Sequence, residues 1–198
     1  MTGQLTSTRS VTSSSTRERR ELHDKKQSRN GWPFVNTDVS VGEWILDTSA
    51  SSIGFQAKAA FGMKVNGRFD RYESAITVGP SLAESAISAT IWTDSVHTGI
   101  KMRDEHLRAD NVFAIARFPT MEFHSAAIVE TPTGFNVTGS LRVREIGKSI
   151  TFHATRSTTT GPPRYNATVV VPPKEYGITR LGTTKPVKVI LEVTLERA

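Results

Sequence analysis

Residues 187–196 read VKVILEVTLE, and apolar side chains occupy every second position along most of this run. Successive side chains of a β-strand point to opposite faces of the sheet, so a period of two predicts a strand with one apolar and one polar face. The positions on the apolar face are Val187, Val189, Leu191, Val193 and Leu195.

The same alternation recurs upstream, in residues 53–57, 87–91, 121–123, 135–143 and 150–154. Turn-forming dipeptides such as Asn66-Gly67 and Gly79-Pro80 separate the runs. Together they predict a mainly β protein with about eight antiparallel strands, arranged either as a sandwich or as a barrel. An eight-stranded barrel has an interior that just holds one small ligand. One helix is predicted within this series, over residues 99–109.

Residues 1–38 have a different composition, with very few apolar residues and many Ser, Thr, Arg and Lys. Such a segment buries too little apolar surface to offset the entropy lost on ordering it. We therefore predict a disordered basic Ser/Thr-rich tail over residues 1–38 and one folded domain over residues 39–198. The tail has no apolar run of the kind found in secretory signals, so we expect a cytoplasmic location and no membrane span.

The chain carries a net charge of +6 and contains no cysteine. Seven basic and three acidic residues lie in residues 1–30, which leaves a charge of only +2 for the rest of the chain. A nucleic-acid-binding domain normally carries its basic patch on the folded part. We therefore expect no specific nucleic-acid partner, although weak attraction of the tail to anionic lipid is a second interpretation. The missing cysteines exclude thiol chemistry and disulfides.

The segment SVHTGIKMRDEHLRADNVFAIARFP, residues 95–119, concentrates the charged residues that a catalytic or metal site would need. Asp104 and His106 are two positions apart, so on a helix they point to different faces and cannot pair. Asp104 and Arg108 are four apart, which predicts a salt bridge. His97 and His106 are nine apart, whereas metal-binding pairs on a helix are usually three or four apart. We therefore predict no metal, no cofactor and no catalytic residue.

The segment from residue 95 to residue 125 also resembles the central motif of the YceI-like family, which ends in EFHS here. Further segments resemble other parts of that family: WILDTSASSIGFQAK at residues 44–58, VNGRFDRYESAI at residues 65–76 and KEYGI at residues 174–178. The resemblance covers about residues 43–196. The matching residues of the central motif are Ser95, Thr98, Gly99, Arg103, Asp104, His106, Leu107, Arg108, Phe113, Pro119, Phe123 and Ser125.

The resemblance implies an extended, lipocalin-like, eight-stranded antiparallel barrel that holds one amphiphile, such as a prenyl phosphate or a quinone tail. We expect the protein to bind an isoprenoid or another long-chain lipid without catalysis, for transport, storage or sequestration. Arg103 and Arg108 are the candidates for contact with a phosphate head group. The full set of predicted ligand-binding residues is Phe55, Phe69, Ile87, Ile91, Arg103, Asp104, His106, Arg108, Phe113, Phe123, Leu141 and Phe152.

Two other functions are compatible with the same sequence. A barrel whose interior is filled by side chains would serve as a stress-response or protein-interaction module. A hydrolase or isomerase would use His97, Asp104 and His106 on a lipid-like substrate. Arg103 and Asp104 could equally form a buried structural pair that holds the helix to the barrel. The oligomeric state is not decided by the sequence, which leaves a homodimer open.

Overall fold

A computed structural model describes residues 39–58, 62–157, 160–179 and 185–198. The predicted tail, residues 1–38, lies outside the described residues. The strands are β1 (Gly42–Leu46), β2 (Ser52–Lys58), β3 (Lys64–Phe69), β4 (Tyr72–Val78), β5 (Ala86–Trp92), β6 (Val96–His97), β7 (Thr120–Thr131), β8 (Gly134–Val143), β9 (Ile146–Arg156), β10 (Arg164–Val171) and β11 (Val187–Arg197). The helices are α2 (Lys101–Arg108) and the 3₁₀ turns η3 (Leu82–Glu84), η4 (Thr93–Ser95) and η5 (Pro173–Tyr176).

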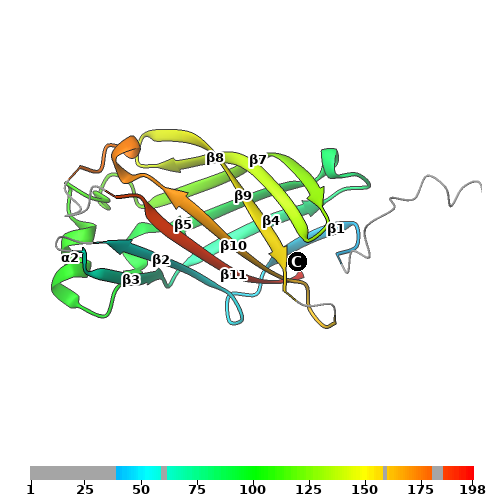
Figure 1. The fold of residues 1–198 in the computed structure, drawn as a ribbon, viewed down its shortest axis with the longest axis horizontal. Coiled ribbons are helices and arrows are strands. Elements are labelled where there is room, and N and C mark those ends of the chain that lie inside the picture. Colours follow the sequence, from blue (N-terminus) through cyan, green and yellow to red (C-terminus); the bar gives the residue numbers. More distant parts are fainter. Residues whose placement is uncertain (1–38, 59–61, 158–159, 180–184) are drawn as a thin grey trace, which may run out of the picture. The chain divides into compact units, whose positions relative to one another are not determined.

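Eight of these strands form one closed antiparallel ring (Figure 1). The ring runs β1-β4-β5-β7-β8-β9-β10-β11 and closes because β11 pairs with β1. Except where β2, β3 and β6 intervene, each strand lies beside the next strand along the chain, so the topology is a simple meander. The predicted barrel is therefore confirmed, and the sandwich is not formed.

The other three strands, β2, β3 and β6, lengthen the barrel at one end. β2 pairs with the first half of β11, while β1 pairs with its second half. β3 likewise continues β4 and pairs with β2 and β6. The turn between β1 and β2 is held by the Asp47 carboxylate, which accepts hydrogen bonds from Ser49 N at 2.9 Å and from Ser49 Oγ at 2.6 Å.

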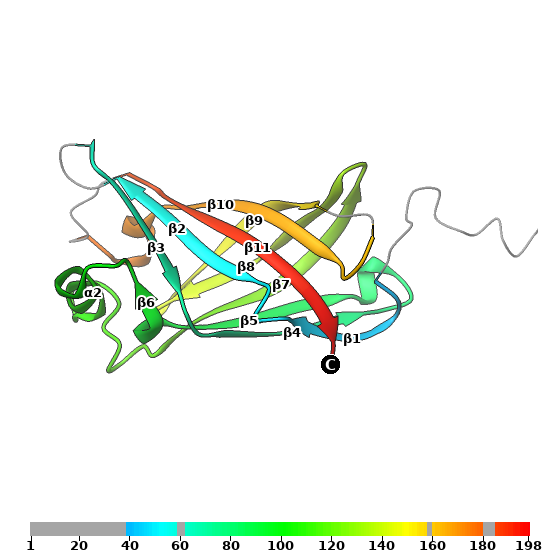
Figure 2. The ribbon, with the colours of Figure 1, turned by 90° about the horizontal axis from the view of Figure 1, so that it is seen from below.

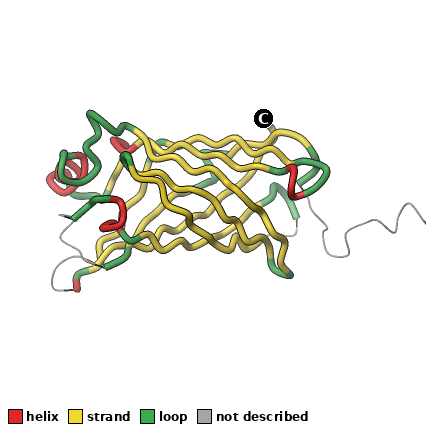
Figure 3. Tube along the Cα trace, turned by 90° about the horizontal axis from the view of Figure 1, so that it is seen from above, coloured by secondary structure: helices red, strands yellow, loops and turns green. Residues whose placement is uncertain are grey.

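The helix α2 lies at the end of the barrel opposite the C-terminus and next to β6 (Figure 2). It occupies eight of the eleven residues that the sequence predicts as helical. Gly99 turns the chain from β6 into α2 with a φ of +79°, a conformation that glycine adopts without strain. Helices and loops lie at the two ends of the barrel and strands form its wall (Figure 3). Among the described helices, none is long and apolar enough to cross a bilayer.

The wall is not equally hydrogen-bonded all the way round. β8 and β9 pair at ten positions, and β10 and β11 pair at eight. β9 and β10, in contrast, pair only at Arg156–Tyr165, Thr155–Asn166 and Ala154–Ala167. No ladder pair joins residues 146–153 of β9 to residues 168–171 of β10. We call this unpaired interval the seam. An open depression of about 430 Å³ lies on the outer wall beside it, lined by residues that include His153, Thr168 and Glu192.

Two glycines of the β8–β9 hairpin provide a test of wall packing. A Cβ at Gly139 would collide with the His124 carbonyl oxygen and the Phe123 ring, whereas a Cβ at Gly147 would meet only Ser140 Oγ, at 3.4 Å. Gly139→Ala should therefore lower the free energy of unfolding by about 2 kcal/mol, and Gly147→Ala should change it by less than about 0.5 kcal/mol. Urea unfolding followed by circular dichroism measures both. Equal effects would contradict this account of the wall.

Candidate ligand-binding site

Alternation and strand register together decide which side chains face the inside of the barrel. Phe55 of β2 pairs with Val189 of β11, and Phe123 of β7 pairs with Leu141 of β8. These positions belong to the apolar phase of each strand, while the neighbouring residues are mostly polar. The inner face is therefore mostly apolar, as the sequence predicts, with polar exceptions such as Ser74, which pairs with Ala89, and Lys148, which pairs with Leu141.

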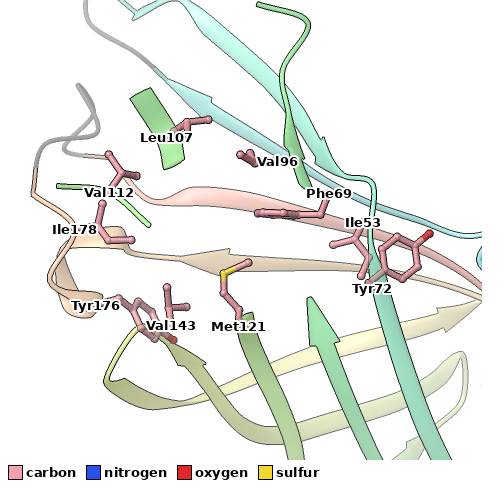
Figure 4. Close-up of a cluster of buried hydrophobic side chains, with 10 residues drawn as sticks. All are labelled: Ile53, Phe69, Tyr72, Val96, Leu107, Val112, Met121, Val143, Tyr176 and Ile178. Carbon is pink, nitrogen blue, oxygen red and sulfur yellow. The ribbon is translucent and has the colours of Figure 1, made fainter. Parts of the chain in front are cut away.

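A cluster of buried apolar side chains fills the end of the barrel next to α2 (Figure 4). Phe69 lies at its centre, with its ring centroid 5.6 Å from that of Phe55 and 6.0 Å from that of Phe113. Leu107 inserts from α2. The cluster consists of Ile53, Phe69, Tyr72, Val96, Leu107, Val112, Met121, Val143, Tyr176 and Ile178. We call it the α2-end cluster.

A second, smaller cluster lies at the other end of the barrel. It contains Val39, Trp44, Tyr165 and Leu195. The Arg197 guanidinium lies over the Trp44 ring, 4.5 Å from its centroid, so a cation–π contact covers the outside of this cluster. Both ends of the barrel are therefore closed by packed side chains, and the interval between them is the candidate binding space.

Inward-facing side chains between the two clusters differ in burial: Phe123 is 7% exposed and Val137 is 2% exposed. Ile87, Ala89, Ile150 and Phe152 all keep part of their surface accessible, although their strands lie within the wall. Phe123 contacts Phe152 here, with ring centroids 5.7 Å apart. We define the lumen as the candidate ligand space between the two clusters, which this partly accessible apolar surface would line.

The structure divides the twelve predicted ligand-binding residues into two groups. The apolar residues lie on the inner wall or in the α2-end cluster: Phe55, Phe69, Ile87, Ile91, Phe113, Phe123, Leu141 and Phe152. The four polar residues lie on α2, where His106 is exposed and Asp104 is buried. The twelve predicted residues therefore form an apolar set in the barrel and a polar set on α2, and the fold separates the two sets.

Three polar residues of α2 hold the helix against β6 and η4: Arg103, Asp104 and Arg108. Asp104, only 5 % exposed, accepts hydrogen bonds from Thr98 N at 2.9 Å and from Thr98 Oγ1 at 2.5 Å. Arg103 donates to Thr98 Oγ1 and to the Thr98 carbonyl, both at 2.8 Å. Arg108 donates to the carbonyl oxygens of Asp94 and Val96. The predicted salt bridge between Asp104 and Arg108 is wrong, because each side chain reaches back to the segment that precedes the helix.

His97 is the only histidine that approaches Asp104 within the described part of the chain, with Nδ1 3.6 Å from Asp104 Oδ2. This contact joins β6 to α2 and was not predicted, because it depends on the turn at Gly99. Across residues 39–58, 62–157, 160–179 and 185–198, no group of three or more His, Asp or Glu side chains is placed to hold a metal ion.

Two further polar side chains at the α2 end were not predicted. The Tyr176 hydroxyl and the Arg144 Nε are buried, and neither has a hydrogen-bond partner among the described residues. Tyr176 follows β10 and Arg144 lies in the β8–β9 turn, and the two segments meet where Arg144 donates to the carbonyl oxygen of Gly177, 33 positions away in sequence. The aromatic position of KEYGI is a signal for Tyr176, but the sequence holds no comparable signal for Arg144.

The three tyrosines of the chain predict how stability depends on alkaline pH. Burial raises the pKa of Tyr72, Tyr165 and Tyr176 above 10.0. The unfolded chain therefore loses these protons at a lower pH than the folded protein does, and the unfolding free energy should fall as pH rises beyond about 10. Urea unfolding at about pH 9 and about pH 11, with tyrosinate absorbance, measures this. Titration of all three hydroxyls near pH 10 without loss of structure would contradict the prediction.

A family model described as the YceI-like domain matches residues 44–197, which include every strand of the closed ring except the start of β1. The chain belongs to the YceI-like family. The match extends over the inner wall, α2 and the α2-end cluster. It confirms the family that the central motif and KEYGI indicate.

Curated relatives of this YceI-like chain include proteins named UPF0312. The protein from Shewanella denitrificans is 27% identical over 125 residues, which cover 61% of this chain and 65% of the relative. The protein from Yersinia pestis is 28% identical over 89 residues, which cover 44% of this chain and 46% of the relative. The matches thus span about half to two thirds of these relatives.

Solved structures share the fold at low sequence identity. BcnA from Burkholderia cenocepacia has a TM-score of 0.67 and 16% identity, with 76% of this chain and 99% of that chain covered. A polyisoprenoid binding domain from Saccharophagus degradans, implicated in plant cell wall breakdown, has a TM-score of 0.60 and 18% identity, with 78% and 98% covered. The Campylobacter jejuni YceI protein has a TM-score of 0.59 and 20% identity, with 85% and 99% covered. These structures support the barrel architecture.

Proposed function

We propose that this YceI-like domain binds one long-chain amphiphilic lipid of the isoprenoid class inside its barrel and carries or sequesters it without chemical change. The observation that supports this proposal is the apolar inner face, on which Ile87, Ala89, Ile150 and Phe152 keep accessible surface between two packed ends. The similar structure from Saccharophagus degradans is described as a polyisoprenoid binding domain, which agrees with a ligand of this class.

The affinity in this proposal comes from burial of the hydrocarbon chain. Removing apolar surface from water contributes about 0.8 kcal/mol for each CH₂ group. One five-carbon isoprene unit therefore contributes about 4 kcal/mol before the entropy costs of binding are subtracted, and a few units reach micromolar affinity. The hydrocarbon chain of the ligand can thus be retained without specific polar contacts. Polar groups of the protein then determine which head group is bound.

A binding role also fits the polar residues of α2. A general base needs a free nitrogen or oxygen within hydrogen-bond distance of its substrate. Asp104 is occupied by Thr98, and Arg103 and Arg108 are occupied by backbone carbonyls. His106 is exposed on α2. These residues stabilise the closed end of the barrel, which favours binding over hydrolysis or isomerisation.

Native mass spectrometry of the purified full-length chain tests the proposal, followed by organic extraction and lipid analysis. We expect an adduct of one lipid per chain, or formation of one after incubation with geranylgeraniol. A mass that stays unliganded after incubation with geranylgeraniol, geranylgeranyl phosphate and a quinone would contradict lipid binding and favour a filled barrel that contacts proteins. The cytoplasmic location and the homodimer stay predictions from the sequence.

A further inference from the structure

The Tyr176 hydroxyl is a buried hydrogen-bond donor without a partner among the described residues. The residue is 1% exposed and lies in the α2-end cluster, beside Val143 (Figure 4). Leaving a buried polar group unsatisfied costs about 1–3 kcal/mol, and native structures contain few such groups. A phenylalanine would fill the same space without this cost. The hydroxyl therefore needs an explanation other than packing.

Arg144 presents a second donor of the same kind. Its side chain is only 13% exposed, and its Nε has no hydrogen-bond partner in the described ranges. Arg144 also has a φ of +57°, in the left-handed region that Asn and Gly occupy most easily in a two-residue hairpin turn. A long cationic side chain thus stands where a smaller residue would suit the backbone better. Unfavourable backbone positions of this kind concentrate at functional sites.

The two donors belong to one place in the fold. The Arg144 guanidinium donates to the carbonyl oxygen of Gly177, the residue after Tyr176, at 3.4 Å. It also lies over the Phe118 ring, 5.5 Å from the centroid, and Arg117 lies over the same ring at 5.0 Å. The planar guanidinium is therefore held in position, and its buried Nε donates no hydrogen bond to the described residues.

The charges around this place favour an anion. Arg117 and Arg144 supply two positive charges, and Lys148 lies on the same face of β9 as Ile146, which packs against the α2-end cluster. Glu145, which is 59% exposed, forms an ion pair with Arg144 Nε at 3.8 Å, beyond hydrogen-bond distance, and Glu175 is exposed as well. Both carboxylates face solvent, where salt screens them.

We propose that Tyr176 and Arg144 form a subsite for the anionic phosphate head group of the lipid, at the α2 end of the lumen. The inference rests on the proposed function. It assigns head-group selection to these two residues and not to Arg103 and Arg108, whose guanidinium groups already donate to backbone carbonyls. Hydrogen bonds from two buried donors to an ionised oxygen are short and strong, so the subsite discriminates a phosphate from an uncharged head group.

Two ligands with the same chain separate the head group from the hydrocarbon. Isothermal titration calorimetry compares geranylgeranyl phosphate with geranylgeraniol, and inorganic phosphate alone reports on the head group without a chain. We expect wild type to bind the phosphate more tightly than the alcohol. Tyr176→Phe should weaken phosphate binding about tenfold, because a hydrogen bond to a charged group is lost, and should leave the affinity for the alcohol unchanged. Inorganic phosphate alone should not bind measurably.

Tyr72→Phe is the matched control. The Tyr72 hydroxyl donates to the carbonyl oxygen of Ser51 at 2.7 Å, so its removal breaks a satisfied hydrogen bond in the same cluster. We expect Tyr72→Phe to lower the melting temperature without changing the ratio of phosphate to alcohol affinity. Tyr176→Phe should instead raise the melting temperature of the unliganded protein, since it removes an unpartnered polar group. Arg144→Gln should weaken phosphate binding more than Arg103→Gln does.

The outcomes distinguish failure of the subsite from failure of lipid binding. If wild type binds both ligands and Tyr176→Phe loses affinity for neither, or equally for both, the head-group subsite is wrong while lipid binding stands. If inorganic phosphate binds as tightly as the phosphorylated lipid, the site serves free phosphate. If wild type binds neither lipid, the proposed function fails and the subsite fails with it.

Discussion

Ala89→Phe is expected to weaken binding of geranylgeraniol about a hundredfold while leaving the protein folded. Ala89 lies on the inner face of β5, between Ser74 of β4 and Phe123 of β7 in the ladder, and is only partly buried. A phenyl ring at this position would occupy part of the lumen. Displacing about one isoprene unit removes about 4 kcal/mol of burial, part of which the chain recovers by shifting.

The same substitution distinguishes a lumen from a filled core. Adding a ring to a closely packed core costs typically about 1–3 kcal/mol of stability, because neighbouring side chains are forced out of their rotamers. In a lumen the ring finds space, and we expect a change of less than about 1 kcal/mol in the free energy of unfolding. Thr90→Phe, one residue along on the outer face, is the control and should affect neither quantity. A large loss of stability with Ala89→Phe would contradict the lumen.

Asp104→Ala should lower the free energy of unfolding by about 3 kcal/mol, because breaking the partners of a buried charge leaves uncompensated groups. Thr98 N and Thr98 Oγ1 would lose their acceptor. The Thr98 hydroxyl, which accepts a hydrogen bond from Arg103 Nε, would then no longer be held in its present orientation. Asp104→Asn keeps one acceptor oxygen and should cost less. Urea unfolding followed by tryptophan fluorescence measures both changes.

Asp110→Ala is the matched control for Asp104→Ala. Asp110 follows the same helix but is exposed, so its removal should change stability by less than about 0.5 kcal/mol. If the two variants were equally stable, Asp104 would not hold α2 to β6. A direct role of Asp104 in contacting the ligand would then regain support.

The strands could be predicted because each has one face toward the apolar interior and one toward solvent. This produces the period of two seen in residues 135–143 and 187–195, and it produces the same period whether the barrel is hollow or filled. The lumen therefore could not be predicted: it depends on how closely side chains from opposite walls approach, which alternation does not record. In the structure Ile87 and Phe152 keep part of their surface accessible, whereas Phe123 and Val137 are buried.

The hydrogen-bond partners of the polar residues could not be predicted from the sequence either. Helical spacing alone predicts that Asp104 pairs with Arg108, yet the positive φ of Gly99 brings Thr98 close enough to donate to Asp104 instead. Arg144 and Gly177 meet only because the chain reaches the β8–β9 turn through η5 after β10 ends. Contacts of this kind depend on a loop path, which residue types and spacing do not specify.

The seam between β9 and β10 affects the width of the ligands that the barrel can bind. A ring with complete ladders has a fixed circumference, since widening it would break backbone hydrogen bonds. Here residues 146–153 and 168–171 share no ladder pair, so the wall can widen along this interval without that loss. We therefore expect the barrel to discriminate ligands by chain length, which the two packed ends limit, more strictly than by branching or ring substituents along the chain.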